Sequence, residues 1–343
     1  MRRRQFLALS SLLGTACARE RESALSRGVR YLWERQARDG GWHSGKYGLL
    51  RSGQSLTPFV LDALPRAAHD SKNVARALAF IKRNTNAEGA VGLMDPMIPD
   101  YPNYSTALAV TTLLRAGERD SIKPMVAYLR GQQFTEQNGW PREHRVYGAW
   151  GMGGERRTPP DIGHVDLSMT RHVLQALAGA GVPRTDPAFS KASVYLGRLQ
   201  NADGGFIFST VEPDTNKAGQ EGDGFRSYGT TTADGILSLL AMGIPVTDER
   251  VQRARRWLLA HHRKSGASGF QGEAYRRWTS GLRYYYAGAS SEAFRLLRDR
   301  VDYDLPDLQQ ADGSWSNPEN LVKEDDPLIA TGFAVRMLAL PAP

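Results

Sequence analysis

Acidic residues stand where some of the expected helices begin. Asp166 precedes an apolar helical pattern, and Asp325 and Asp326 stand directly before Pro327, a residue that suits the first turn of a helix. A carboxylate in such a position commonly caps the helix by accepting a backbone N–H bond. A partly buried carboxyl with a raised pKa can instead act as a general acid. We therefore treat these three residues as candidate catalytic acids, with helix capping as the alternative for each.

A second group of polar and aromatic residues lies at or near the expected starts of the more apolar helices. Aromatic rings on a cavity wall can stabilise a carbocation by cation–π attraction. They can also stack on a sugar, or pack in the core with no ligand at all. These interpretations all stay open. The candidate ligand-binding residues are Tyr104, His164, Tyr228, Asp234, Trp278, Tyr284 and Tyr285.

One cluster has side chains of the type that bind metals. His172 follows His164 by eight residues, about two helical turns, so both could lie on one face near Asp166. Two imidazoles and a carboxylate would suit zinc or another transition metal. The simpler interpretation, three unrelated polar residues beside a loop, is favoured. The sequence therefore predicts no metal site and no cofactor.

A recurring sequence motif indicates the elements that must position these residues. Gln36–Trp42, Gln200–Phe206 and Gln309–Trp315 each read Gln, three residues, Gly, one residue and an aromatic ring. Looser copies close at Val91, Trp140 and Phe270. The Asp-Gly pair provides a tight turn, and the Gln amide can bond backbone groups at a helix end. A phrase repeated in this way predicts an array of one supersecondary unit.

Helical patterns flank these turns, a more polar one before each and a more apolar one after. Val165, Met169 and Val173 follow a helical spacing, and helices of this kind end at Gly181 and Gly243, each followed two residues later by Pro. Six such pairs are enough to close a ring. The sequence thus predicts an all-α, six-repeat α/α toroid, with the more apolar helices forming the inner wall.

In such a toroid the N-termini of the inner helices gather at one mouth, where their dipoles favour an anion. The candidate residues above would meet there. Two irregular segments, 148–163 and 207–226, are long enough to act as lids or binding loops. No linker divides the chain, so residues 22–343 are expected to form a single domain.

The Q-x-x-x-G-x-W turns resemble the QW repeats of squalene–hopene cyclases, whose superfamily includes the β subunits of protein prenyltransferases. The resemblance spans nearly the whole chain after residue 21 and implies an α/α toroid with a central cavity for an apolar, isoprenoid-like ligand. The acidic D-x-D-D motif of the cyclases is absent, and the nearest string is Lys323–Pro327. The chain has no cysteine after Cys17, so neither the zinc ligands of the prenyltransferases nor the thioester of complement-type toroids can form. The resemblance therefore implies a fold and a cavity more than a reaction.

Four functions remain open at this point. The first is an exported toroid that binds an apolar or isoprenoid-like ligand, with or without catalysis. The second is an active terpenoid-cyclase-like enzyme that uses a non-standard Asp as its acid. The third is a carbohydrate-active α/α barrel, and the fourth is a non-catalytic scaffold of the cell envelope.

Residues 1–21 are predicted to be an export leader. Arg3 and Arg4, followed by Gln-Phe-Leu, fit the core of a twin-arginine signal, and a short apolar stretch comes next. Cys17 follows small residues as in a bacterial lipobox, so it is a candidate lipidation site and membrane anchor. The expected location is the periplasm or a membrane-anchored position in the cell envelope. The formal charge of +8 is dispersed without a basic stripe, so no nucleic-acid partner is expected.

Overall fold

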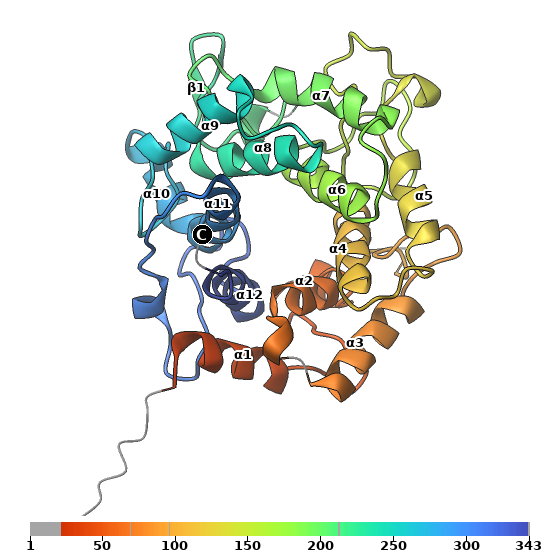
Figure 1. Cartoon of the computed structure of the whole chain (residues 1–343), viewed down its shortest axis with the longest axis vertical. Coiled ribbons are helices and arrows are strands. Elements are labelled where there is room, and N and C mark those ends of the chain that lie inside the picture. The colour runs from red at the N-terminus through yellow and green to blue at the C-terminus, as the bar shows by residue number, and fades with distance from the viewer. Residues whose placement is uncertain (1–21, 69, 96, 212, 342–343) are drawn as a thin grey trace, which may run out of the picture.

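The chain folds into a closed double ring of helices (Figure 1). This computed structural model describes residues 22–68, 70–95, 97–211 and 213–341, so the predicted leader and Cys17 lie outside the described residues. Each inner helix packs against the next, and the last packs against the first, which closes the ring. The inner helices are α2 (Leu56–Ala63), α4 (Pro102–Arg115), α6 (Leu167–Gly179), α8 (Gly229–Ala241), α11 (Arg283–Leu297) and α12 (Pro327–Leu338).

An outer layer of helices surrounds this ring (Figure 1). Helices α3, α5, α7 and α9 each pack against the inner helix that precedes them, and α1 packs against α12. The outer helices are α1 (Ala24–Glu34), α3 (Ser71–Arg83), α5 (Lys123–Gly131), α7 (Pro187–Leu199), α9 (Glu249–Ala260) and α10 (Glu273–Gly281). The remaining elements are the 3-10 helices 48–50, 66–68, 136–138, 213–215 and 305–308, and a hairpin of β1 (Gln220–Glu221) and β2 (Gly224–Phe225). The predicted all-α toroid is confirmed.

The polarity of the helices explains which layer each one joins. In α8 every residue from Gly229 to Leu239 is buried, as expected for a helix that has no charged face toward solvent and is enclosed by its neighbours. In α9 only Val251, Ala254, Trp257 and Leu258 are buried, which is one stripe of an amphipathic helix. Among the described residues, no helix is both long enough and apolar enough to span a membrane.

The repeated turns hold the two layers together. The Gln36 side-chain amide donates to the carbonyl oxygens of Gly40, at 3.0 Å, and of Asn73 in the next outer helix, at 2.8 Å. The indole of Trp42 donates to Leu32 O at 2.7 Å. A threonine of the inner helix accepts the backbone N–H of the apolar residue that closes the turn. These threonines are Thr57, Thr106, Thr170, Thr232 and Thr331.

The prediction that Trp140 closes the third turn is wrong, because Trp150 does so. The Trp150 indole donates to Leu129 O at 2.7 Å, and Gln133 donates to the carbonyl oxygen of Gly148 at 3.0 Å. Residues 134–147 separate this Gln from its turn glycine, where only three residues lie between Gln36 and Gly40, and this longer spacing hides the pattern in the sequence. Gly148 has φ 88°, and a Cβ there would lie 1.9 Å from the carbonyl oxygen of Lys191, so the turn requires glycine.

The second half of the ring departs from a strict helix pair per turn. An additional helix, α10, lies directly before the inner helix α11, and the element before the last turn is only the 3-10 helix 305–308. The irregular segments 148–163 and 207–226 both contact α6, the first through the bond from Trp150 N to Thr170 Oγ1 at 3.2 Å. The bond from Leu167 N to Phe208 O ties the second segment to the start of α6. This segment therefore reaches the mouth at the N-terminal ends of the inner helices.

Candidate functional site

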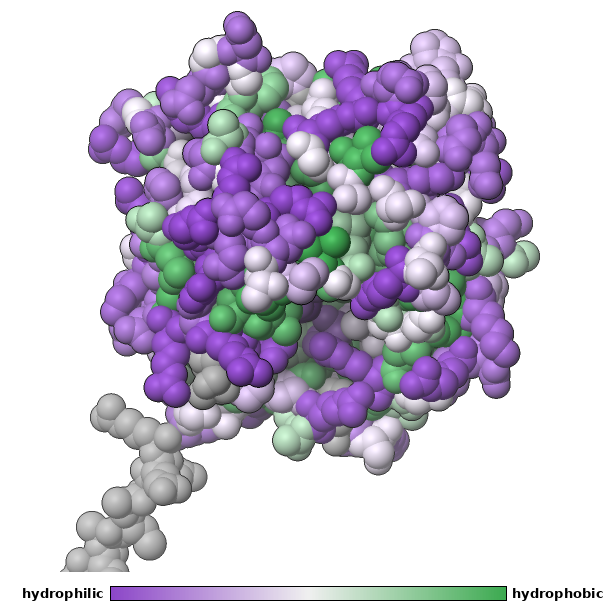
Figure 2. All heavy atoms as spheres, turned by 45° about the horizontal axis from the view of Figure 1, so that its top comes forward, coloured by the Kyte–Doolittle hydropathy of each residue, from purple (hydrophilic) through white to green (hydrophobic). Residues whose placement is uncertain are grey.

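A cavity of about 270 Å³ lies in the centre of the ring, at the N-terminal ends of the inner helices. Most of the side chains around it are apolar or aromatic. Figure 2 shows a face covered mainly by hydrophilic residues, with hydrophobic residues gathered around a hollow near its middle. The apolar and aromatic lining consists of Leu50, Leu56, Phe59, Tyr101, Tyr104, Met169, Phe208, Tyr228, Leu282, Tyr285, Val322, Ile329 and Phe333.

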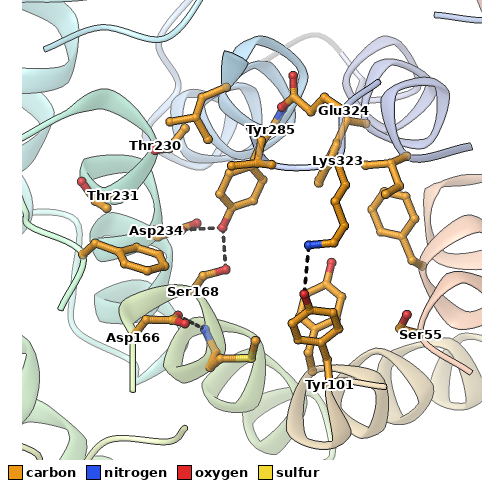
Figure 3. A pocket seen from close by; sticks show the side chains of 18 of the residues that line it. Ser55, Tyr101, Asp166, Ser168, Thr230, Thr231, Asp234, Tyr285, Lys323 and Glu324 are labelled. Carbon is orange, nitrogen blue, oxygen red and sulfur yellow. Dashed lines mark hydrogen bonds between the residues drawn. The ribbon is translucent and has the colours of Figure 1, made fainter. Parts of the chain in front are cut away.

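The cavity brings together residues that are far apart in the sequence, several of them predicted as site residues. They come from α4, α6, α8 and α11 and from the segment before α6, so the inner-helix N-termini do share one mouth (Figure 3). The predicted site residues that line the cavity are Tyr104, His164, Asp166, Tyr228, Asp234 and Tyr285.

Asp325 and Asp326, predicted as candidate acids, do not line the cavity. Asp326 caps α12 by accepting the N–H of Leu328 at 2.9 Å, and its other oxygen accepts a bond from Ser44. Asp325 faces Lys46, with which it forms an ion pair at 2.5 Å, and it also accepts a bond from the Tyr47 hydroxyl. These two carboxylates hold the start of α12 against the segment after α1, so the capping alternative describes Asp326.

Two of the aromatic residues predicted to bind a ligand also lie outside the cavity lining. Tyr284 is buried, and its hydroxyl donates to Ser316 O at 3.3 Å, away from the cavity wall. Trp278 lies on α10, one helix outside the inner ring. The centroid of the Trp278 ring lies 5.8 Å from the Nζ atom of Lys217, which does line the cavity. Tyr285, the residue after Tyr284, points into the cavity.

His164 and Asp166 form an acid–base pair in the wall. The imidazole Nε2 lies 2.5 Å from Asp166 Oδ2, while Oδ1 of the same carboxylate caps α6 by accepting the N–H of Met169 at 2.8 Å. Asp166 is buried, and the His164 side chain is 30% exposed. The imidazole therefore joins a buried carboxyl to solvent, and histidine is the side chain that exchanges protons most readily near neutral pH.

A second carboxyl, Asp234, lies in a hydrogen-bonded chain on the same wall (Figure 3). The Tyr285 hydroxyl donates to Asp234 Oδ2 at 2.6 Å and lies 2.7 Å from the Ser168 hydroxyl. Arg171 binds Asp234 Oδ1 at 3.1 Å. Burial raises the pKa of Asp234 to about 6, against the opposing effects of Arg171 and Tyr285. Both oxygens of this carboxyl are thus held by groups of the protein itself.

Arg171 also begins a buried network of ion pairs beyond the cavity. Its guanidinium binds Glu292 at 3.2 Å, Glu292 binds Arg336 at 2.8 Å, and Arg336 binds Asp62 at 2.9 Å. Burial would raise the pKa of Glu292, but Arg336 and Arg171 outweigh it and hold the value at about 2. With Arg115, which pairs with Asp62 at 2.8 Å, the six members come one from each inner helix.

These six charges form the inner ion-pair network: Asp62, Arg115, Arg171, Asp234, Glu292 and Arg336. Three are acidic and three are basic, so the network is formally neutral. Asp62, Arg115 and Arg336 lie in the last turns of their helices, whereas the cavity-lining residues of α2 and α12 lie in the first two turns. The network therefore extends from Asp234 in the cavity wall to charges that lie beneath the cavity.

A third carboxyl in the wall, Glu324, was not predicted. It is fully buried and accepts the N–H bonds of Tyr284 and Tyr285 at 3.0 and 2.7 Å, which caps α11. The Asn317 amide donates to it as well, at 3.0 Å. Burial raises the pKa of Glu324 to about 7, against these three hydrogen bonds. Its role in the structure is to position the helix that carries Tyr285.

The described residues hold no group of three or more His, Cys, Asp or Glu side chains placed to bind one metal ion. His172, the third member of the cluster considered above, is buried, and burial lowers its pKa. Its Nδ1 lies 2.8 Å from Ser168 O, and its ring packs edge-on against Tyr104 at 4.5 Å between centroids.

The chain is similar in sequence to known proteins of one fold family. No family model matches the chain. The chain is 28% identical over 290 residues to the squalene–hopene cyclase of Bradyrhizobium diazoefficiens, an alignment that covers 81% of this chain and 36% of the cyclase. The chain therefore spans about a third of the length of that relative. The resemblance to squalene–hopene cyclases that the turns indicated is confirmed at the level of the fold family.

Solved structures agree on the toroid. A type II terpene cyclase from Scytonema, in complex with geranylgeranyl dihydroxybenzoate as substrate, matches with a TM-score of 0.58 at 14% identity, covering 92% of this chain and 95% of that chain. A D-mannose isomerase matches with a TM-score of 0.57 at 10% identity, covering 92% and 95%. Proteins that act on isoprenoids and on sugars thus share this fold, so the residues of the cavity must decide between them.

Proposed function

We propose that this protein binds an apolar, isoprenoid-like molecule in its central cavity, and that His164 and Asp166 transfer a proton to it there. The observation that carries the proposal is a wall of apolar and aromatic side chains with one proton-exchanging pair set into it. The similarity to squalene–hopene cyclases and the prenylated substrate of the Scytonema enzyme support the same ligand class.

The lining favours an isoprenoid over a sugar. A sugar presents hydroxyl groups on every side, and each one needs a polar partner when it is buried. Phe59, Phe208 and Phe333 offer none, and the carboxyls of Asp234 and Glu324 are already bonded to groups of their own chain. An isoprenoid needs only apolar contact, which burial of its methylene and methyl groups makes favourable.

The proposed proton transfer begins on Asp166 in its protonated form. The carboxyl proton would pass to an alkene carbon of the ligand, leaving a carboxylate on the protein and a carbocation in the cavity. Aromatic faces such as those of Tyr228 and Phe333 attract a cation. The cation would then lose a proton to a water molecule at the mouth, which completes the reaction with no change in oxidation state. The partly exposed His164 would return a proton from solvent to Asp166.

The predicted leader adds a separate proposal about location. We propose that residues 1–21 direct export by the twin-arginine route and that Cys17 carries a lipid, which would place the toroid at the cell envelope. An apolar ligand drawn from a membrane would then be close to the mouth of the cavity.

Filling the cavity tests the binding proposal. Ile329 is an apolar residue of α12 in the cavity lining, and Ile329→Trp would place a large ring in a space of only about 270 Å³. We expect the affinity for farnesol, a fifteen-carbon prenyl alcohol, to fall at least tenfold, measured as equilibrium binding of the radiolabelled alcohol.

Leu308→Trp is the matched control, because Leu308 is an exposed leucine that does not line the cavity. This variant should bind farnesol as the parent protein does. Equal binding by both variants would place the ligand elsewhere on the protein, and no binding by the parent would remove the proposed function.

A further inference from the structure

The mouth of the apolar cavity carries a lysine side chain, Lys323, that reaches across it (Figure 3). Its ammonium donates to the Tyr101 hydroxyl at 3.1 Å and lies 5.7 Å from the centroids of the Tyr47 and Tyr101 rings. Among the residues that the structure describes, Lys323 forms no ion pair, whereas the nearby Lys46 pairs with Asp325. The positive charge of Lys323 therefore faces a largely apolar space with only a neutral partner.

The three carboxyls of the cavity wall do not compensate this charge, because each is bonded to other groups. Asp166 is held by His164 and the N–H of Met169, and Asp234 is held by Arg171 and Tyr285. Glu324, the neighbour of Lys323 in the chain, accepts two N–H bonds at the start of α11. An anion delivered by a ligand would meet an ammonium that no carboxylate already neutralises.

The backbone on both sides of this contact is strained. Lys323 has φ 65° and Tyr101 has φ 45°, values in the left-handed region that side chains other than glycine rarely adopt. The hydrogen bond between them joins the segment before α12 to the start of α4 across the mouth. Strain of this kind collects at ligand clamps, where the surrounding structure maintains it.

A second ammonium lines the same cavity. Lys217, from the segment 207–226, has its Nζ 3.7 Å from the centroid of the Phe208 ring and 3.1 Å from Thr215 O. The mouth thus combines two lysines and a tyrosine hydroxyl above apolar walls. This is the arrangement that an amphiphile needs, with its charged end at the mouth and its chain inside.

We propose that Lys323, with the Tyr101 hydroxyl, binds the anionic head group of an amphiphilic ligand whose isoprenoid tail occupies the cavity. The inference rests on the proposed function, because the head group belongs to the same ligand whose isoprenoid tail is proposed to fill the cavity. A carboxylate and a phosphate monoester both offer the oxygens that an ammonium and a hydroxyl would bind.

The test compares three ligands with one tail: farnesol, farnesoic acid and farnesyl monophosphate. The parent protein should bind at least one of the two anions ten or more times tighter than the alcohol, and the tighter of the two identifies the head group. Lys323→Met, which keeps the length of the side chain and removes its charge, should lower the affinity for that anion at least tenfold. Its affinity for farnesol should stay within twofold.

Two further variants separate binding from folding. Lys323→Gly removes the ammonium and also relieves the positive φ, so it should raise the thermal midpoint while it abolishes the preference for the anion. Lys46→Met removes a lysine that is paired with Asp325 outside the cavity lining, and it should leave the preference unchanged.

The outcomes distinguish this inference from the proposed function. The head-group site is refuted, and the apolar site stands, if farnesol binds but neither anion binds more tightly. The same conclusion follows if Lys323→Met lowers the affinity for the alcohol and for the anion equally. If no prenyl ligand binds, the proposed function itself fails.

Discussion

An Asp166→Asn protein is expected to fold normally and bind its ligand, and to lose about 10²- to 10⁴-fold in turnover, the usual contribution of a general acid. Asparagine caps helices as well as aspartate does, so the bond from the Met169 N–H to the side-chain oxygen is retained. The amide cannot release a proton to an alkene, and it cannot receive one from His164. The measurement is single-turnover product formation from a prenyl substrate that binds, followed by gas chromatography and mass spectrometry.

Asp326→Asn is the matched control for this prediction. Asp326 is also a helix cap, since it accepts the N–H of Leu328 at the start of α12 at 2.9 Å, but it does not line the cavity. The control should therefore keep the turnover of the parent protein. Turnover retained by Asp166→Asn, or lost equally by both variants, would remove Asp166 from the role of acid.

Arg171→Met is expected to lower the free energy of unfolding by about 3–5 kcal/mol, as removal of one partner from a buried ion pair commonly does. The Arg171 side chain is only 3% exposed and is the link between Asp234 and Glu292. Without it, two buried carboxylates on α8 and α11 each lose a cationic partner, and their desolvation is no longer compensated. Denaturant unfolding followed by circular dichroism measures the change.

Arg115→Met removes a member of the same network at its exposed end. The Arg115 side chain is 44% exposed, and its partner Asp62 keeps the bond to Arg336 at 2.9 Å. This variant should lose about 1 kcal/mol or less, the usual value for a pair that solvent screens. Equal losses in the free energy of unfolding for Arg171→Met and Arg115→Met would show that burial does not determine how much each ion pair contributes to stability.

The ring could be predicted from the sequence because its turns are encoded locally. Gln36 to Trp42 and Gln309 to Trp315 contain both the glycine of the turn and the side chains that fix it. The third turn could not be located in this way, because an insertion separates Gln133 from Gly148 and Trp150. Trp140 fits the local phrase by chance, and its indole donates to Arg157 O at 3.1 Å.

Part of the cavity wall was also predictable, because helix starts can be located and a toroid gathers them. This reasoning led to His164, Asp166, Asp234 and Tyr285, which do line the cavity. It could not distinguish Glu324 from its neighbour Asp325. The chain passes through a positive φ at Lys323 just before them, and the sequence does not show which carboxylate then faces inward.

The inner ion-pair network was not predicted, although its signal is present in the sequence. Asp62, Arg171 and Glu292 lie in helices whose residues are mostly buried, where an unpaired charge would be costly. Their partners lie on other helices, 44 to 274 residues away in the sequence. Only the closed ring shows that these charges compensate one another.

The central claim is that an isoprenoid chain occupies the cavity, and photoaffinity labelling tests it most directly. The probe is farnesol that carries a diazirine on its terminal isoprene unit, irradiated with the full protein and mapped by peptide mass spectrometry. We predict adducts on cavity-lining residues of α2, α6 and α12, such as Phe59, Met169 and Phe333, and we predict that excess farnesol abolishes them. Adducts confined to the outer helices, or labelling that excess farnesol does not reduce, would contradict the account.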